Sequence, residues 1–388
     1  MTAGPSALPA FDLSAARRIL VVKLDEAGDL VLATPFLRGL RASAPQASIT
    51  LAVRPPLAEL ALRCPWVDGV VLPLVKPDGR GLDFRGATPE ALARFMADFR
   101  AGFDLAIVPR YDLDRHGATT LVAASGARLS LGYSERVTPW KAEANAGFDR
   151  AYTHVLAASP GIHEVEHNLA LLAHLGGRTD GAGTDAVALC LTEADRAAAL
   201  RLTAGVADGR RLIAVAPGTA SPRRNYPPDQ LAAVTGRLCD ALHADVVLLG
   251  TAEDAAAVAA VAQALPRRVH DLTGRTTLPE AAAVIERGAL LLAMDSGPAH
   301  LAAAVGTPVA VFSCHPVGGD PTFIHAPERF RPWTRRALVL QPAAPVPPCT
   351  DSCRDAGAHC IVTIEPDRAA AAILDFLAAL PATTGEPR

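Results

Sequence analysis

The sequence has few aromatic residues, no excess of positive charge and no long uninterrupted apolar run. Aromatic residues make up 5% of the 388 residues, and the 37 lysines and arginines are outnumbered by 40 aspartates and glutamates, giving a formal net charge of −3. Because no positive field is present to attract a polyanionic backbone, a nucleic-acid-binding protein is disfavoured. The most apolar stretch, 289–313, is interrupted by Asp295, His300 and several glycines and prolines, and so predicts no transmembrane helix.

A secretory signal is also missing, since residues 1–18 contain no basic segment followed by an apolar core. We therefore expect a cytoplasmic protein and leave open a peripheral contact with the inner membrane. The seven cysteines are odd in number, which does not suggest a disulfide framework. Four of them, Cys64, Cys190, Cys239 and Cys314, are scattered through the expected helices and strands and are interpreted as reduced thiols.

Half of the residues are hydrophobic, and short apolar runs alternate with segments of helical period. From Arg18 an apolar strand, a helix and a second apolar strand follow one another, which is one βα unit feeding a parallel strand. Apolar runs without polar alternation indicate strands buried on both faces, as in a parallel sheet covered by helices. The predicted fold class is α/β, with two Rossmann-like parallel domains that face a central cleft.

The expected elements and boundaries follow from this alternation. We predict strands over 69–75, 104–109, 212–216, 244–249, 290–294 and 309–312, and helices over 89–100, 118–124, 228–243, 252–265, 278–287, 298–305 and 366–380. The predicted organisation is a flexible segment over 1–15, an acceptor-side domain over 16–180, a nucleotide-sugar domain over 181–365, and a final helix and tail over 366–388, with the linker near 176–186.

Three turns that follow predicted strands carry residues suited to chemistry. In KLDEAGD, Asp29 falls in the first turn of the next helix, where it is either an acid favoured by the helix dipole or a general base. In APGTASPRRNYPPDQ, Arg223 and Arg224 either neutralise a phosphate or are solvated loop cations. Neither a dinucleotide-binding glycine motif nor a P-loop is present.

The third turn, MDSGPAH, places Asp295, Ser296 and Gly297 directly before a helix that has Pro298 in its first turn. A helix N-terminus of this kind binds anions, and Asp295 can accept hydrogen bonds from sugar hydroxyls. A simple capping role remains the alternative.

Two further groups of residues suggest metal sites. Asp112 and Asp114 form an Asp-Leu-Asp sequence, which we interpret as part of a surface loop because it lies away from the donor loops. Cys349, Cys353 and Cys360 are spaced closely enough to bind zinc or iron. Reduced thiols or a labile disulfide are alternatives, because the neighbouring His359 and Cys360 rarely both bind one ion and no fourth ligand is evident.

Taken together, the three turns and the late cysteine segment resemble glycosyltransferase family 9, the ADP-heptose:lipopolysaccharide heptosyltransferase family. The resemblance runs from about residue 19 to about residue 380 and is carried by KLDEAGDLVLATPFLRGLR, PGTASPRRNYPPDQLAAV, DLTGRTTLPEAAAVIERGALLLAMDSGPAHLAAAVGTPVAVF and CTDSCRDAGAHC. It implies the two-domain GT-B fold and an inverting transfer of heptose from ADP-heptose to an acceptor hydroxyl, with a glycan or glycolipid such as the lipopolysaccharide inner core as the acceptor.

The resemblance also implies roles for individual residues. Asp29 matches the catalytic base, and Arg224 matches the basic residue that holds the departing diphosphate. The matches to donor-binding positions are Thr219, Glu253, Asp295, Ser296, Gly297 and His300. In the family's Lys-x-Trp-Pro pattern, this chain has Arg224 for lysine and Tyr226 for tryptophan, a change that bears on the preferred donor because arginine binds a diphosphate bidentately.

The resemblance predicts that no cofactor is required and that catalysis is metal-independent. A structural ion at the late cysteines stays an alternative to reduced thiols or a labile disulfide. Other interpretations remain. The chain is alternatively a non-catalytic nucleotide-sugar-binding protein, a heptosyltransferase for a protein or small-molecule acceptor, or a nucleotide-sugar epimerase.

Overall fold

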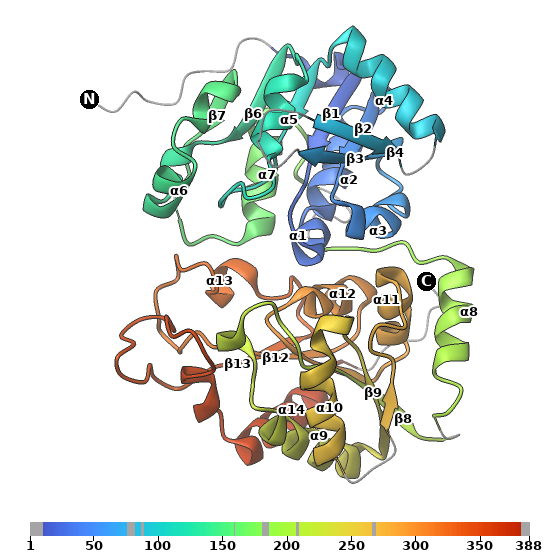
Figure 1. Ribbon diagram of the computed structural model, residues 1–388, viewed down its shortest axis with the longest axis vertical. Helices are drawn as coiled ribbons and strands as arrows, with labels where there is room; N and C mark the ends of the chain where they lie inside the picture. Colours follow the sequence, from blue (N-terminus) through green and yellow to red (C-terminus); the bar gives the residue numbers. More distant parts are fainter. Residues whose placement is uncertain are drawn as a thin grey trace. The chain divides into compact units, whose positions relative to one another are not determined.

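The computed structural model describes residues 11–75, 82–86, 89–158, 160–180, 186–206, 209–265 and 269–381. The chain divides into two compact units, Met1–Cys190 and Leu191–Arg388. Each unit is built on its own β-sheet with helices packed around it (Figure 1). The predicted linker near 176–186 lies partly outside the described residues, as does most of the predicted N-terminal segment.

The first unit contains a seven-stranded sheet in the order β4-β3-β2-β1-β5-β6-β7. Its strands are β1 (Arg18–Val22), β2 (Ser48–Ala52), β3 (Gly69–Val75), β4 (Leu82–Gly86), β5 (Leu105–Ile107), β6 (Leu129–Tyr133) and β7 (His154–Leu156). Its helices are α1 (Ala27–Leu32), α2 (Thr34–Ser43), α3 (Ala58–Leu62), α4 (Pro89–Ala101), α5 (Ala118–Ala124), α6 (Pro139–Ala144) and α7 (Glu164–His174), with short 3₁₀ turns η1 (Leu13–Ala15), η2 (Pro55–Leu57), η3 (Glu135–Val137) and η4 (Phe148–Ala151).

The second unit contains a six-stranded sheet in the order β10-β9-β8-β11-β12-β13, in which all strand pairs are parallel. Its strands are β8 (Arg211–Ala216), β9 (Ala244–Leu248), β10 (Val269–Asp271), β11 (Leu290–Met294), β12 (Val309–Phe312) and β13 (Ala337–Leu340). Its helices are α8 (Glu193–Leu202), α9 (Pro228–Leu242), α10 (Ala255–Ala264), α11 (Leu278–Glu286), α12 (Gly297–Val305), α13 (Pro327–Phe330) and α14 (Pro366–Ala379), with 3₁₀ turns η5 (Pro222–Arg224), η6 (Ala252–Asp254) and η7 (Cys360–Thr363).

Both sheets have the strand order of a Rossmann fold, apart from the extra edge strand β4. In each unit the first strand lies at the centre and the chain turns first to one side of it and then to the other. The switch point lies between β1 and β5 in the first unit and between β8 and β11 in the second. Because ligands of open α/β sheets bind where the strand order reverses, the loops after these four strands are the places to look for a site.

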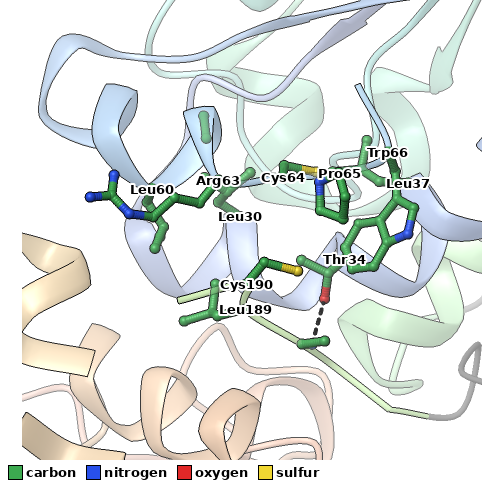
Figure 2. A pocket seen from close by; sticks show the side chains of 12 residues that line it. Leu30, Thr34, Leu37, Leu60, Arg63, Cys64, Pro65, Trp66, Leu189 and Cys190 are labelled. Atoms are coloured by element: carbon green, nitrogen blue, oxygen red, sulfur yellow. Dashed lines mark hydrogen bonds between the residues drawn. The ribbon is translucent and has the colours of Figure 1, made fainter. Parts of the chain in front are cut away.

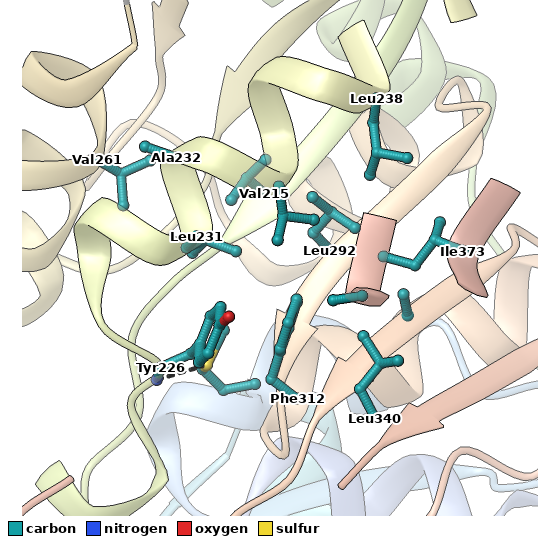
Figure 3. Close-up of a cluster of buried hydrophobic side chains, with 14 of the residues drawn as sticks. Val215, Tyr226, Leu231, Ala232, Leu238, Val261, Leu292, Phe312, Leu340 and Ile373 are labelled. Atoms are coloured by element: carbon teal, nitrogen blue, oxygen red, sulfur yellow. Dashed lines mark hydrogen bonds between the residues drawn. The ribbon is translucent and has the colours of Figure 1, made fainter. Parts of the chain in front are cut away.

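The central strands form because their residues are apolar and fully covered. Every residue of β11, β12 and β9 is buried, as expected for strands with helices on both faces. In the second unit the core extends from Val215 and Leu292 on the sheet to Leu231 on α9 and Ile373 on α14 (Figure 3). The C-terminal helix is therefore part of the core of the second unit.

The structure confirms the predicted two-sheet α/β fold, with differences mainly at the sheet edges. Strands β11 and β12 have the predicted bounds, whereas the edge strands β4, β7, β10 and β13 and the interior strand β6 were not predicted. Strand β4 runs antiparallel to β3, so the first sheet is mixed and not purely parallel. Residues 252–265 form η6 followed by α10 instead of one helix. The predicted frayed tail, beyond residue 381, lies outside the described residues.

The predicted flexible segment 1–15 ends in an ordered turn within the described part of the chain. Asp12 caps η1 by accepting a hydrogen bond from the Ser14 amide at 3.0 Å. The side chain of Leu13 is buried. Residues 11–15 therefore pack against the first unit.

Candidate active site

Charged residues gather at the switch point of the first unit, directly after β1 and β5. Lys23 Nζ lies 2.9 Å from Asp25 Oδ2 and donates a hydrogen bond to the Pro109 carbonyl at 2.7 Å. Arg110 connects the two carboxylates, with Nη1 2.8 Å from Asp29 Oδ1 and Nε 3.5 Å from Asp25 Oδ1. The result is a chain of alternating charges that ends at Asp29.

Asp29 is the third residue of α1, and its two carboxylate oxygens have different surroundings. Oδ1 accepts the hydrogen bond from Arg110, whereas Oδ2 lies 3.3 Å from the backbone amide of Glu26. The Asp29 side chain is 14% exposed. Asp29 therefore lies in the first turn of α1, as expected, while Arg110 fixes the orientation of its carboxylate and leaves Oδ2 weakly engaged.

The electrostatics of this cluster favour the ionised forms of Asp25 and Arg110. Burial alone would raise the pKa of Asp25, but the neighbouring Arg110 and Lys23 outweigh it and lower that pKa. The pKa of Arg110 is raised well above its usual value, because Asp25 and Asp29 more than offset its desolvation. Asp25 and Arg110 therefore remain charged together in a largely buried place.

The Asp-Leu-Asp sequence lies in the loop between β5 and α5, as expected, but its first carboxylate is buried and not at the surface. Asp112 is buried and accepts a hydrogen bond from Trp140 Nε1 at 2.8 Å. Asp114 accepts four backbone hydrogen bonds at the start of α5, including those from Gly117 at 2.9 Å and Thr119 at 2.7 Å. Their oxygens are committed to N–H donors, so the pair is structural.

A small pocket in the first unit does not serve as the substrate site. It lies behind α1 and α2 and is lined by apolar side chains, among them Leu30, Leu37 and Trp66 (Figure 2). Its cavity volume of about 20 Å³ is room for about one water molecule. Cys64 lines it, and burial raises the pKa of that thiol to about 11, which makes it unreactive.

In the second unit, the loop after β8 brings Arg224 to the end of β11. Arg224 Nη1 donates to the Asp295 carbonyl at 2.8 Å and lies 3.5 Å from Asp295 Oδ2. The Nε atoms of Arg223 and Arg224 are buried and have no hydrogen-bond partner. Since buried donors normally find acceptors, these two atoms are available to a ligand that carries anionic oxygens.

Tyr226 anchors this loop in the core. Its ring stacks on Phe312 with centroids 4.4 Å apart, and its hydroxyl donates to the Ile364 carbonyl at 2.5 Å. Its backbone amide donates a hydrogen bond to the thioether sulfur Sδ of Met294 at 3.2 Å, as the dashed line in Figure 3 shows. The core therefore accommodates Tyr226, which stands where the family pattern has tryptophan. The same packing positions Arg224, two residues earlier in the loop.

Helix α12 begins beside the Arg224 guanidinium. Its cap residue Ser296 hydrogen bonds back to the Met294 carbonyl at 3.3 Å and does not cap the helix with its side chain. Gly297 is the first helical residue, and the amides of a first helical turn have no acceptors within the helix. His300 lies one turn further on and is buried. The first turn of α12 and Arg224 thus form one cationic corner.

His325 joins this corner from the loop before α13. Its Nδ1 lies 4.0 Å from Asp295 Oδ2. Burial, with a contribution from the Arg224 charge, lowers the pKa of His325 to about 4. The imidazole is therefore neutral near pH 7.

The loops after β8 and β9 approach each other closely at a glycine. A Cβ atom on Gly218 would lie 1.9 Å from Asp254 Oδ1. Asp254 is itself held by the amide of Thr251 at 2.8 Å. The predicted ligand Glu253 is exposed in η6, next to this contact. Thr219 is engaged within its own loop, with its hydroxyl 2.7 Å from the Ser221 carbonyl and 2.8 Å from Asn225 Oδ1.

The structure therefore brings some of the predicted residues together and adds others. Arg224, Asp295, Ser296 and Gly297 meet at one corner of the second unit, whereas Asp29 belongs to the first unit. Sequence reasoning missed Arg110, Lys23 and His325. The position of Arg110 in the sequence could have revealed it, because Arg110 follows the central strand β5 just as Asp25 follows β1.

The late cysteines do have a fourth donor, against our expectation. The ligand atoms of Cys349, Cys353, His359 and Cys360 all lie within 4.8 Å of one another. His359 and Cys360 both point into the group although they are adjacent in the sequence. The cluster is therefore able to hold a metal ion.

Among the described residues, no helix combines the length and the apolar character needed to cross a bilayer.

Comparisons with known proteins agree with this geometry. The model of glycosyltransferase family 9 (heptosyltransferase) matches residues 118–354. The lipopolysaccharide heptosyltransferase 3 of Escherichia coli K12 is 27% identical over 323 residues, covering 80% of this chain and 84% of that protein.

Solved structures share the fold over nearly the whole chain. A family 9 glycosyltransferase of Veillonella parvula has a TM-score of 0.73 at 21% identity, covering 96% of this chain and 99% of that one. The ADP-heptose lipopolysaccharide heptosyltransferase II of E. coli has a TM-score of 0.66 at 19% identity, covering 93% and 98%. An E. coli heptosyltransferase solved with ADP has a TM-score of 0.64 at 15% identity, covering 92% and 99%. With the two Rossmann-like units of a GT-B fold and a family model that matches more than half of its residues, this chain belongs to glycosyltransferase family 9, the heptosyltransferase family.

Proposed function

We propose that this protein transfers a heptose from ADP-heptose to a hydroxyl group of the lipopolysaccharide inner core, with inversion at the anomeric carbon and without a catalytic metal. The observation that carries the proposal is the cationic corner of the second unit. There the Nε atoms of Arg223 and Arg224 are buried without a partner beside the first turn of α12. A diphosphate supplies the anionic oxygens that such donors bind.

The first unit supplies the base in this proposal. Asp29 Oδ2, which has only a 3.3 Å approach from the Glu26 amide, takes the proton of the acceptor hydroxyl, while Arg110 holds Oδ1. The acceptor oxygen forms a bond to the anomeric carbon as the bond from that carbon to the diphosphate breaks. One carboxylate opposite the leaving group suits a single displacement, and hence inversion.

The second unit takes up the charge that develops on the leaving diphosphate. Arg224 and the α12 amides act where this charge grows, so they stabilise the transition state more than the bound donor. The corner needs no divalent cation in this scheme. In this proposal residues of both units act in the same turnover. We therefore expect the turnover to include a conformational step.

Support for the donor and the acceptor comes from the relatives. The related E. coli structures include one with ADP and one described as an ADP-heptose enzyme, and the curated relative acts on lipopolysaccharide by its name. The proposed location is the cytoplasm, with access to a glycolipid at the inner membrane. Glu253, Thr219 and His300 remain proposed donor contacts.

The test is a transfer assay with purified protein and a panel of donors and acceptors. We expect ADP release and a new glycoside with ADP-heptose and a heptosylated inner-core oligosaccharide, with little turnover for UDP-sugars or GDP-sugars. NMR of the product should show the anomeric configuration opposite to that of the donor. Donor binding with no ADP release in the presence of any acceptor would favour a non-catalytic binding protein. Transfer only to a peptide or to a small molecule would show that the lipopolysaccharide inner core is not the acceptor.

A further inference from the structure

A compact group of sulfur and nitrogen donors lies between β13 and α14, outside the proposed reaction. It consists of Cys349, Cys353, His359 and Cys360, whose ligand atoms all lie within 4.8 Å of one another. His359 Nδ1 is 3.7 Å from Cys349 Sγ and 3.5 Å from Cys360 Sγ. All of these cysteines are free thiols.

These distances match the edges of a tetrahedron around one metal ion. With Zn–S bonds of about 2.3 Å and Zn–N bonds of about 2.0–2.1 Å, tetrahedral geometry gives a sulfur-to-nitrogen separation of about 3.6 Å. The two measured separations lie on either side of this value. His359, Cys349 and Cys360 therefore already have the separations that a shared metal ion would require, and Cys353 Sγ lies within 4.8 Å of each of their ligand atoms.

The surroundings of the sulfurs are also those of a metal site. The backbone amides of Arg354 and Asp355 donate hydrogen bonds to the sulfur of Cys349, and the Val346 amide lies 3.5 Å from Cys360 Sγ. Such amide donors orient and stabilise metal-bound thiolates. Cys353 and Cys360 are fully buried, so an ion at this centre would be shielded from water.

We propose that Cys349, Cys353, His359 and Cys360 bind one structural Zn²⁺ ion. Three thiolates and one imidazole are donors that zinc prefers, and four protein ligands close a tetrahedral site, leaving no open position for catalysis. The proposal is independent of the proposed transfer reaction, since none of the four residues takes part in it.

The ion would stabilise a segment that supports the donor corner. Residue Ile364, just after η7, accepts the hydrogen bond of Tyr226, which lies two residues from Arg224. The Asp351 carbonyl accepts a hydrogen bond from the Asp320 amide at 2.8 Å, in the loop that continues to His325. Loss of the ion should therefore lower the unfolding temperature first and weaken donor binding as a later consequence.

The experiment measures metal content, affinity and stability in full-length protein expressed with zinc and iron both supplied. His359→Ala and Cys349→Ser remove ligands that are only half-buried, so the variants should fold. Cys190→Ser and Cys314→Ser remove thiols outside the cluster as matched controls. Metal content is measured by mass spectrometry, zinc affinity by competition with a chromogenic chelator, and geometry by the visible spectrum after replacement with Co²⁺.

We expect one zinc per chain in the wild type and in both controls, and a tetrahedral thiolate spectrum with Co²⁺. The two ligand variants should bind zinc at least about 100-fold more weakly, with lower unfolding temperatures that added zinc does not restore. The proposal is overturned by wild-type protein that neither contains zinc nor binds it after reconstitution, or by ligand variants that retain zinc as the controls do. One iron per chain in place of zinc would overturn the identity of the ion.

Discussion

The two units share one strand order but use their switch points differently. In the first unit, the charges after β1 and β5 satisfy one another, since Arg110 pairs with both Asp25 and Asp29 while Lys23 pairs with Asp25. In the second unit, Arg223 and Arg224 each have a buried Nε without a hydrogen-bond partner, as Arg110 has, but Arg224 lies beside one carboxylate, at 3.5 Å, where Arg110 lies between two. The same topology thus supports a positioned carboxylate in one unit and an anion site in the other.

The comparison shows that the fold provides the place and the loop residues decide the chemistry. A closed ion network holds its members rigidly and is suited to fixing a base. An incomplete set of donors is suited to binding a ligand that completes it. Substitutions should therefore have different consequences in the two units.

The largest expected effect is on turnover when the base is removed. Asp29→Asn should lower kcat by about 10² to 10⁴-fold, because general-base assistance is lost while the shape is preserved. The exposed Glu26→Gln in the same turn is the matched control and should remain within about threefold of the wild type. Initial rates of ADP release measure both, and an Asp29→Asn enzyme with full kcat would remove Asp29 from the base role.

Stability should distinguish the two arginines. Arg110→Met leaves two largely buried carboxylates unpaired and should cost about 3 kcal/mol of unfolding free energy. Arg224→Met removes one hydrogen bond to the Asp295 carbonyl and one ion pair with a 3.5 Å separation, and should cost about 1 kcal/mol. Urea unfolding of both variants at pH 7 is the measurement. Equal losses would contradict the distinction between a closed network and an open anion site.

The pH dependence of stability should report on His325. The pKa of His325 is about 4 in the folded protein and about 6.5 when unfolded. Between these two pH values the unfolded chain binds the proton and the folded chain does not. Stability should fall on acidification, by about 2 kcal/mol between pH 7 and pH 5 from this group alone. His325→Gln should remove that part of the slope, measured by urea unfolding at both pH values. An unchanged slope would show that His325 titrates normally.

The smallest expected effect is that of chelation on catalysis. Brief exposure to EDTA should leave the initial rate unchanged, because Arg224 and the α12 amides replace a divalent cation at the diphosphate. Immediate inhibition that Mg²⁺ reverses, at an unchanged unfolding temperature, would show that the reaction uses a catalytic metal.

The sequence predicted the centre of each sheet better than its edges. Strands such as β11 and β12 are continuous apolar runs, which burial on both faces requires. The edge strand β10 has the sequence Val-His-Asp and is partly exposed, so it forms through pairing with β9 and has no apolar run of its own. Nothing local in such a segment indicates a strand.

The site was predictable where function depends on neighbours in the sequence. The turn from Asp295 to Gly297 is contiguous, and its position before a helix can be deduced from the residues themselves. The pairing of Arg110 with Asp29 joins residues 81 positions apart, and the contact between His325 and Asp295 likewise depends on the folded chain. His359 was discounted as a ligand because adjacent histidine and cysteine residues rarely both bind one ion, whereas the folded turn brings both His359 and Cys360 into the group.

The most direct test of the division of labour between the units is the affinity for ADP, measured by calorimetry in two variants. Asp29→Ala should bind ADP within about twofold of the wild type, because its unit takes no part in holding the diphosphate. Arg224→Ala should bind ADP at least about tenfold more weakly, with partial recovery in Arg224→Lys, because it removes a charge-assisted donor. Arg224→Ala with wild-type affinity, or Asp29→Ala weakened as much as Arg224→Ala, would contradict the account.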